Sequence, residues 1–403
     1  MRGARPQWEV ADVIHLFGDP YRQTHPVSPA QHRAMEAIVT CRTAQLGGYA
    51  ESCTQCGFAR YAYRSCRNRH CPTCQTLTSA RWLEARAAEL LPTPYFHTVF
   101  TLPHELNPLV LGNKRVLLDL LFQAASQTLL QFGRQSLGGQ MASTMVLHTW
   151  DQLLGAHFHL HCLVPGGALV DEGTQWVPTH PRFLFPVQAL GTVFRAKFLE
   201  TFSQLASTGK LRFAAELADL GTAQGLRALL DRLYAKPWVV YAKPPWAGPK
   251  PVLDYLGRYT HRVAIANHRL VDVRDSQVCL TYRHRRQGKQ QQITTMAGGE
   301  FLRRFLLHIL PSGFVRIRHY GFLANRCKTR ALRQCRHLLG QAPQPPSRAP
   351  KTVAQWVKQW TGHEIMACPR CGHHPLVRTP LPHGRTFPSP RAPPPGVSHV
   401  DTS

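Results

Sequence analysis

Acidic side chains are scarce in this chain of 403 residues. Asp and Glu together number 22 against 48 Lys and Arg, which leaves a formal net charge of +26 at pH 7. So large a positive excess excludes a generally basic partner and favours a polyanion, and nucleic acid is the leading candidate. The charge by itself says nothing about the fold.

Long uninterrupted apolar runs are also missing. The first residues, MRGARPQWEVADVIHLFGD, contain no apolar segment of the kind that forms a secretory signal. The most apolar long stretch, residues 116–132, includes Asp119 and three Gln. It has helical periodicity, whereas a membrane span needs ~20 unbroken apolar residues. We therefore expect a protein that stays inside the cell and has no membrane partner.

Cysteines, by contrast, are numerous, and they occur in CxxC steps. CTQC (53–56) and CPTC (71–74) are separated by 14 residues. In a reducing compartment this spacing indicates tetrahedral Zn²⁺ ligation, with incidental reduced cysteines as the alternative. We predict a structural zinc site with the ligands Cys53, Cys56, Cys71 and Cys74. Cys41 and Cys66 are surplus, so either the site uses a different four or a second metal lies beside the first.

The pattern of apolar residues divides the chain into three parts. Residues 1–92 are predicted to form a helical, zinc-binding and DNA-binding domain, which includes helices at 28–42 and 78–91. Residues 93–340 are predicted to form an α+β domain with helices packed on an antiparallel sheet. The strands expected there are 95–102, 144–150, 156–164, 263–267 and 278–284, and the helices 112–134, 187–207, 222–234, a segment containing YLGRY, and 300–310.

The C-terminal residues 341–403 are rich in proline and are predicted to be mostly a disordered tail. One island in it, CPRCGHH (368–374), has a single CxxC, which supplies only two metal ligands. His373 or His374 would have to complete a site there.

The stretch GAHFHLHCLV (155–164) places three histidines at alternate positions. In a β-strand His157, His159 and His161 share one face while Phe158 and Leu160 share the other. Imidazoles grouped in this way favour a metal site with positions open for phosphate oxygens, and the alternative is a polar strand that faces solvent.

Two tyrosines four residues apart occur in VLDYLGRYTHRVAIAN (252–267). On a helix Tyr255 and Tyr259 lie on one face. Aromatic pairs at this spacing usually pack in a core. The basic residues around this pair, however, are unfavourable in a buried core and favourable for binding the phosphodiester of DNA. The arginines expected to bind the DNA backbone are Arg258, Arg262, Arg316, Arg318, Arg326 and Arg330.

The run HTWDQLLGAHFHLHCLVPGG (148–167) resembles the HUH motif (histidine, hydrophobic residue, histidine) of the insertion-sequence ninety-one family of rolling-circle transposases. Further likenesses to that family are SCRNRHCPTCQ, YFHTVFTLPHEL, KPWVVYAKPPWAGPKPVLDYLGRYTHRVAIAN and EFLRRFLLHILPSGFVRIRHYGFLAN, in consistent order over roughly residues 28–340. The resemblance implies an HUH-nuclease sheet and an N-terminal zinc-binding module. It also implies His159 and His161 as ligands of catalytic Mg²⁺ or Mn²⁺, His157 as a candidate third ligand, and Tyr255 and Tyr259 as nucleophiles.

The activity implied by this resemblance is transposition in a bacterial cytoplasm, near the nucleoid. One tyrosine would attack single-stranded DNA at an element end, and the second would serve a second cleavage or transfer into target DNA. The sequence contains no Walker motif, so we expect no ATP site. Two alternatives remain: a plasmid replication initiator or relaxase with the same chemistry, and a non-catalytic zinc-dependent DNA-binding protein.

Overall fold

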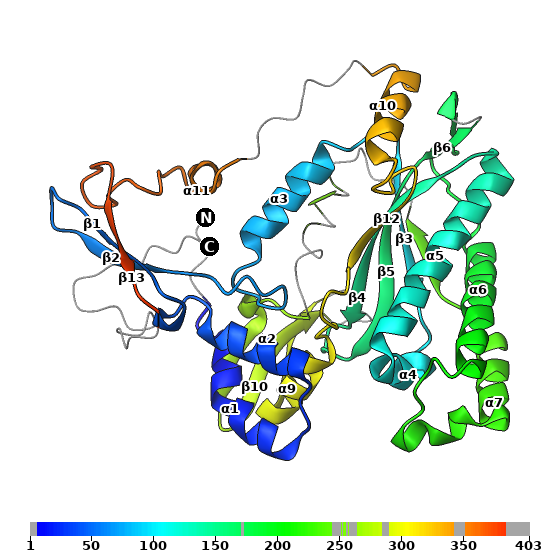
Figure 1. Ribbon diagram of the computed structural model, residues 1–403, viewed down its shortest axis with the longest axis horizontal. Helices are drawn as coiled ribbons and strands as arrows, with labels where there is room; N and C mark the ends of the chain where they lie inside the picture. Colours follow the sequence, from blue (N-terminus) through cyan, green and yellow to red (C-terminus); the bar gives the residue numbers. More distant parts are fainter. Residues whose placement is uncertain are drawn as a thin grey trace. The chain divides into compact units, whose positions relative to one another are not determined.

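The structure is a computed structural model that describes residues 6–170, 173–243, 251, 253–254, 257, 264–283, 290–341 and 351–383. The chain divides into two compact units, and neither is continuous in sequence (Figure 1). The first unit comprises residues 1–82, 261–309 and 348–403, and the second comprises residues 83–260 and 310–347. Segments from both ends of the chain therefore belong to the first unit.

A five-stranded antiparallel sheet is the centre of the second unit. Its strand order is β12-β4-β5-β3-β8, and each neighbouring pair is antiparallel. The strands are β3 (Tyr95–Thr101), β4 (Ala142–Trp150), β5 (Ala156–Pro165), β8 (Val240–Lys243) and β12 (Ile317–Gly321). Together with the helices around it, this sheet confirms the α+β class expected from the sequence.

Alternation along the strands gives the sheet an apolar face and a polar face. On β5, Phe158, Leu160 and Cys162 are buried, and histidines occupy the positions between and before them. The apolar side chains share a core with α5 (Lys114–Leu137) and α6 (Val187–Ser207), which lie on one side of the sheet (Figure 1). Each large apolar side chain buried there contributes ~1.5–3 kcal/mol. A slip of one residue would move the histidines into this core, so burial fixes the register.

Smaller elements complete the second unit. They are η2 (His104–Leu106), α4 (Asn107–Gly112), β6 (Gly167–Val170), β7 (Gln175–Pro178), η4 (Ala215–Gly221), α7 (Ala223–Tyr234) and α10 (Lys328–Leu338). Helix α3 (Thr76–Ala87) begins in the first unit and ends in the second.

The first unit contains two three-stranded sheets and several helices. One sheet has the order β11-β10-β9 and the other the order β13-β1-β2. The strands are β1 (Gly48–Ser52), β2 (Ala59–Tyr63), β9 (Leu270–Arg274), β10 (Gln277–Arg283), β11 (Gln291–Ala297) and β13 (Val377–Leu381). The helices are α1 (Val10–Thr24), α2 (Pro29–Thr40), η1 (Ala44–Leu46), η5 (Asn267–Arg269), α9 (Gly298–Leu307) and α11 (Val353–Thr361).

Helix α2 begins where its capping residues predict. Gln31 N donates to Ser28 Oγ (3.4 Å), and Ser28 N donates to Gln31 Oε1 (2.9 Å), which together form a capping box. Pro29 occupies the first helical position, where the missing N–H has no intrahelical acceptor in any case. This helix confirms the start predicted at Ser28.

The strand predicted at 263–267 is wrong for the part that the structure describes. Ala264 has a φ of 59°, and Asn267 begins η5 instead of ending a strand. The Asn267 side chain accepts a hydrogen bond from Val10 N (3.2 Å) and donates one to Thr73 Oγ1 (3.1 Å). These long-range bonds require a turn at Asn267, and the strand β9 starts only at Leu270.

The C-terminal segment also differs from the expectation. Residues 351–383 are not simply a tail, because they contain α11 and the strand β13, which pairs with β1. The domain boundaries expected at residues 92 and 340 stay predictions. None of the helices within the described ranges is both long enough and apolar enough to cross a membrane.

Candidate active site and metal centres

A tight turn between β4 and β5 sets which histidines face one another. Asp151 Oδ1 accepts hydrogen bonds from Leu153 N (2.8 Å) and Gly155 N (2.7 Å), which close the turn. The resulting register places His148 directly opposite His159. Both side chains therefore point to the polar face of the sheet.

Three histidines on this face form a candidate metal site. The ligand nitrogens of His148, His159 and His161 all lie within 4.8 Å of one another. His161 and His159 are the pair predicted from the HUH motif. The third predicted ligand, His157, is outside this group, and His148 takes its place.

Strand geometry explains this grouping. Residues directly opposite on neighbouring strands have Cβ atoms ~4.5–5.5 Å apart, whereas residues two apart on one strand are further from each other. The His157 ring is nevertheless closer to the His159 ring, at 4.7 Å between centroids, than the His148 ring is, at 5.4 Å. What distinguishes His148 is that its ring also lies 4.3 Å from the ring of His161. The sequence carries a signal for it, because the short segment between TMVLHTW and GAHFHLH indicates a hairpin whose strands face each other.

Hydrogen bonds at the Nδ1 atoms orient two of these rings. His159 Nδ1 lies 2.9 Å from the His157 carbonyl oxygen, to which it donates. His161 Nδ1 lies 2.8 Å from His97 Nε2, and we assign the proton of this bond to His161. In both rings the lone pair is then on Nε2, which is the tautomer that binds a metal when Nδ1–H is held by an acceptor.

The surroundings keep the rings of His161 and His97 neutral. Burial holds the pKa of His161 well below its usual value, and the rings of His159, His97 and His157 and the charge of Lys243 lower it further. Burial, together with Lys243, lowers the pKa of His97 to about 4. Neutral rings offer lone pairs, and an all-imidazole set suits a first-row divalent ion such as Mn²⁺ in affinity more than Mg²⁺. Lys243, opposite His97 on β8, also makes this face attractive to phosphate.

The predicted nucleophiles Tyr255 and Tyr259 lie outside the described residues, as do Arg258 and Arg262. Gly257, between the two tyrosines, is described. A Cβ atom added at Gly257 would be 2.5 Å from both δ-carbons of Leu83 on α3. Gly257 is therefore in close contact with the end of α3 that belongs to the same unit.

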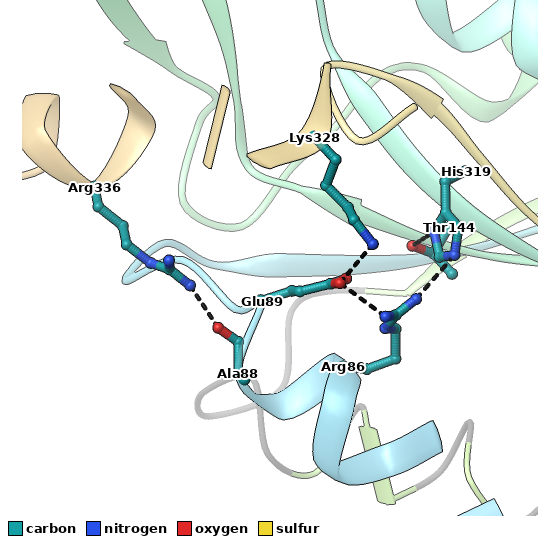
Figure 2. Close-up of polar contacts among 7 residues, drawn as sticks. All are labelled: Arg86, Ala88, Glu89, Thr144, His319, Lys328 and Arg336. Atoms are coloured by element: carbon teal, nitrogen blue, oxygen red, sulfur yellow. Dashed lines mark hydrogen bonds and ion pairs between the residues drawn. The ribbon is translucent and has the colours of Figure 1, made fainter. Parts of the chain in front are cut away.

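That end of α3 is fastened to the polar face of the sheet (Figure 2). Arg86 Nη1 donates to His319 Nε2 (3.0 Å), and His319 Nδ1 donates to Thr144 Oγ1 (2.9 Å). Thr144 and His148 lie on the same face of β4. The carboxylate of Glu89 accepts from Arg86 (2.7 Å) and from Lys328 (2.6 Å). Leu83 and Arg86, one turn apart, thus connect Gly257 to the face that carries the histidines.

The arginines predicted to bind DNA occupy different surroundings. Arg318 forms an ion pair with Asp119, and its Cζ lies 4.2 Å from the Phe122 ring centroid, on the helix-covered side of the sheet. This arginine is thus engaged in packing and is not placed with the histidines. Arg316 is half-buried, whereas Arg326 and Arg330 are exposed.

The cysteines form two groups, which agrees with the alternative of a second metal that the sequence left open. The first group is Cys41, Cys66, Cys71 and Cys74, with ligand atoms within 4.8 Å of one another and 3.7 Å between the sulfurs of Cys66 and Cys74. Four thiols at such distances fit a tetrahedral Zn²⁺. Cys53 and Cys56 belong to a second group with Cys368 and Cys371. The predicted combination of Cys53 and Cys56 with Cys71 and Cys74 is therefore corrected, because the fold separates the two CxxC steps.

Known proteins share these features. Residues 13–102 match a family model described as a transposase zinc-binding domain, and residues 142–331 match one described as a putative transposase. A putative transposase of Sinorhizobium fredii is 47% identical over 390 residues, which cover 96% of this chain and 98% of the relative. The transposase for insertion sequence element IS801 of Pseudomonas savastanoi pv. phaseolicola is 29% identical over 341 residues, 83% of this chain and 80% of the relative. No solved structure matches the chain.

Proposed function

Because this chain belongs to the transposases of the insertion-sequence ninety-one family, we propose that it moves its element by rolling-circle transposition in the bacterial cytoplasm. Its substrate as a transposase is DNA, which agrees with the net charge of +26. We propose further that it cuts and rejoins single strands through a covalent tyrosine intermediate. The observation that supports this most is the histidine trio on two adjacent strands, in which the rings of His159 and His161 are oriented by hydrogen bonds at Nδ1.

In this proposal His148, His159 and His161 hold a divalent cation, Mn²⁺ or Mg²⁺. A cation held there would supply charge withdrawal from phosphate oxygens and would favour in-line displacement at phosphorus. His97 and the His157 carbonyl keep the ligand rings in the required orientation. Lys243 adds positive charge to the same face.

Tyr255 or Tyr259 is proposed as the nucleophile. Its phenol oxygen forms a bond to phosphorus, the bond from phosphorus to the 3′-oxygen breaks, and the 3′-oxygen takes up a proton. The 5′-phosphate stays on the tyrosine, so the energy of the broken bond is conserved for rejoining. The contact of Gly257 with Leu83, one turn from Arg86, supports a tyrosine segment on the histidine side of the sheet.

The test uses a single-stranded oligonucleotide of the element end, labelled at its 3′ end, with Mn²⁺ or Mg²⁺. A labelled adduct that resists denaturant is expected for the wild-type chain and absent from the double variant Tyr255→Phe, Tyr259→Phe. The matched control is Tyr234→Phe, an exposed tyrosine on α7, which should form the adduct at the wild-type rate. An adduct that persists in the double variant would refute the assignment of the nucleophiles.

A replication initiator or relaxase would form the same adduct. Mobilisation of a marked element in cells separates the two activities, because only a transposase inserts the element at a new site. Failure to mobilise, with the adduct intact, would point to the replication or transfer function.

A further inference from the structure

Two short turns at opposite ends of the chain have the same construction. They are CTQCGF (53–58) and CPRCGH (368–373). In each, the N–H of the first cysteine donates to the carbonyl five residues later, at 2.8 Å in both turns, and the glycine N–H donates to the carbonyl of the first cysteine. The glycines, Gly57 and Gly372, have φ values of 69° and 76°, which side-chain-bearing residues rarely adopt. Each turn thus presents its two thiols in the same manner.

The four thiols of these turns meet. The sulfurs of Cys53 and Cys371 are 3.6 Å apart, and those of Cys56 and Cys368 are 3.5 Å apart. Zn–S bonds of about 2.3 Å in a tetrahedron give sulfur separations of about 3.8 Å, whereas a disulfide requires about 2.05 Å. None of the four is in a disulfide. The distances therefore fit a shared metal ion and not covalent pairing.

A buried ion pair joins the same two parts of the chain independently of the thiols. Glu51 on β1 is 1% exposed and lies opposite Arg60 on β2 and Arg378 on β13. Its carboxylate accepts from Arg60 Nε (2.5 Å) and from Arg378 Nε (2.6 Å). Loss of either arginine would leave a buried charge poorly compensated, so β13 is held in one register against β1.

We infer that Cys53, Cys56, Cys368 and Cys371 bind a second Zn²⁺, separate from the ion expected at Cys41, Cys66, Cys71 and Cys74. With four thiolates the ion has no open position, so its role is structural. It fastens the C-terminal segment 364–383 to the N-terminal strands β1 and β2 as a zinc ribbon. The matched zinc-binding domain, residues 13–102, contains only half of these ligands.

The test is to measure zinc per chain in purified full-length variants by mass spectrometry of the native protein. The wild-type chain should hold two ions. The pair Cys368→Ser, Cys371→Ser should hold one, and so should the pair Cys53→Ser, Cys56→Ser. The quadruple variant should also hold one, because both pairs serve the same ion. Cys279→Ser, Cys327→Ser is the matched control and should keep two, since neither thiol is in a cysteine group.

Two zinc ions in the Cys368→Ser, Cys371→Ser variant would overturn the inference, and so would one ion in the wild-type chain. Hydrogen exchange of the wild-type protein gives a second measurement that needs no variant. Chelation of zinc should raise exchange at residues 368–381 and 53–63 together. Exchange at 368–381 that is equally fast with and without zinc would refute the ribbon even if a variant failed to fold.

Discussion

His148 lies directly opposite His159 across β4 and β5, with their ring centroids 5.4 Å apart. We predict that His148→Ala lowers Mn²⁺ affinity by more than ~100-fold, beyond the ~10–100-fold range of outer-shell changes, because a direct ligand is lost. Isothermal titration with Mn²⁺ measures this. The control is His157→Ala, which keeps the backbone carbonyl that orients His159 and should change affinity by less than ~10-fold. A larger loss in His157→Ala than in His148→Ala would restore the ligand set expected from the sequence.

His97 should act as a positioning residue for His161. We predict that His97→Ala lowers Mn²⁺ affinity and adduct formation by ~10–100-fold, because His161 Nδ1 loses its acceptor at 2.8 Å. His97→Gln, whose amide oxygen can accept the same hydrogen bond, should recover part of the loss. If the His97→Ala and His97→Gln variants bind Mn²⁺ equally well, the hydrogen bond has no role in orienting His161.

Because Gly257 is in close contact with Leu83, we predict that a second substitution at Leu83 restores adduct formation in a Gly257 variant. Gly257→Ala should reduce adduct formation by ~10–100-fold while Mn²⁺ affinity stays unchanged, because a shift of ~1 Å in the tyrosine segment is costly for in-line attack. Leu83→Ala removes the δ-carbons that the new methyl group would meet at 2.5 Å. The double variant should therefore be more active than Gly257→Ala alone. Equal rates of adduct formation in Gly257→Ala and in the double variant would mean that α3 does not position the segment that contains Tyr255 and Tyr259.

His319 predicts a dependence of stability on pH. Burial, with the charges of Arg86 and Lys328, lowers its pKa from 6.5 to about 4. The unfolded chain therefore takes up a proton at higher pH than the folded chain. The contribution of His319 to the free energy of unfolding is fully present above pH ~6.5 and is lost as the pH falls towards ~4. The loss should reach ~3 kcal/mol in the free energy of unfolding.

Urea unfolding of the wild-type chain and His319→Gln between pH 7.5 and 4.5 measures this effect. Glutamine does not titrate, so the wild-type advantage should shrink as the pH falls. Parallel pH profiles of the two proteins would assign the acid sensitivity to other groups, such as His97.

Arginines on β12 and at the start of α10 should separate into two classes. Arg318→Ala should lower the free energy of unfolding by ~1–3 kcal/mol, because the stacking on Phe122 and the ion pair with Asp119 are lost. Arg326→Ala and Arg330→Ala, at exposed positions, should leave stability unchanged. Each should weaken single-strand binding and reduce the slope of log affinity against log salt by ~0.7. An unchanged slope in both would remove these residues from the DNA interface.

Periodicity and spacing in the sequence determined much of this protein. The alternation in GAHFHLHCLV placed His159 and His161 on one face and Phe158 and Leu160 on the other, because a strand repeats every two residues whatever surrounds it. The start of α2 at Ser28 and the presence of zinc-type thiol pairs were predictable for the same reason, since each depends on residues a few positions apart. The family resemblance was likewise contained in local motifs.

Only the tertiary structure decided which of these residues share a site. His148, and not His157, groups with His159 and His161, because the hairpin register places His148 opposite His159 and its ring 4.3 Å from that of His161. The CxxC steps were divided between two sites because the pairs Cys53–Cys371 and Cys56–Cys368, 318 and 312 positions apart, are brought together by the pairing of β13 with β1. The cysteine contacts depend on the closure of long stretches of chain around buried cores, and no local pattern in the sequence encodes them.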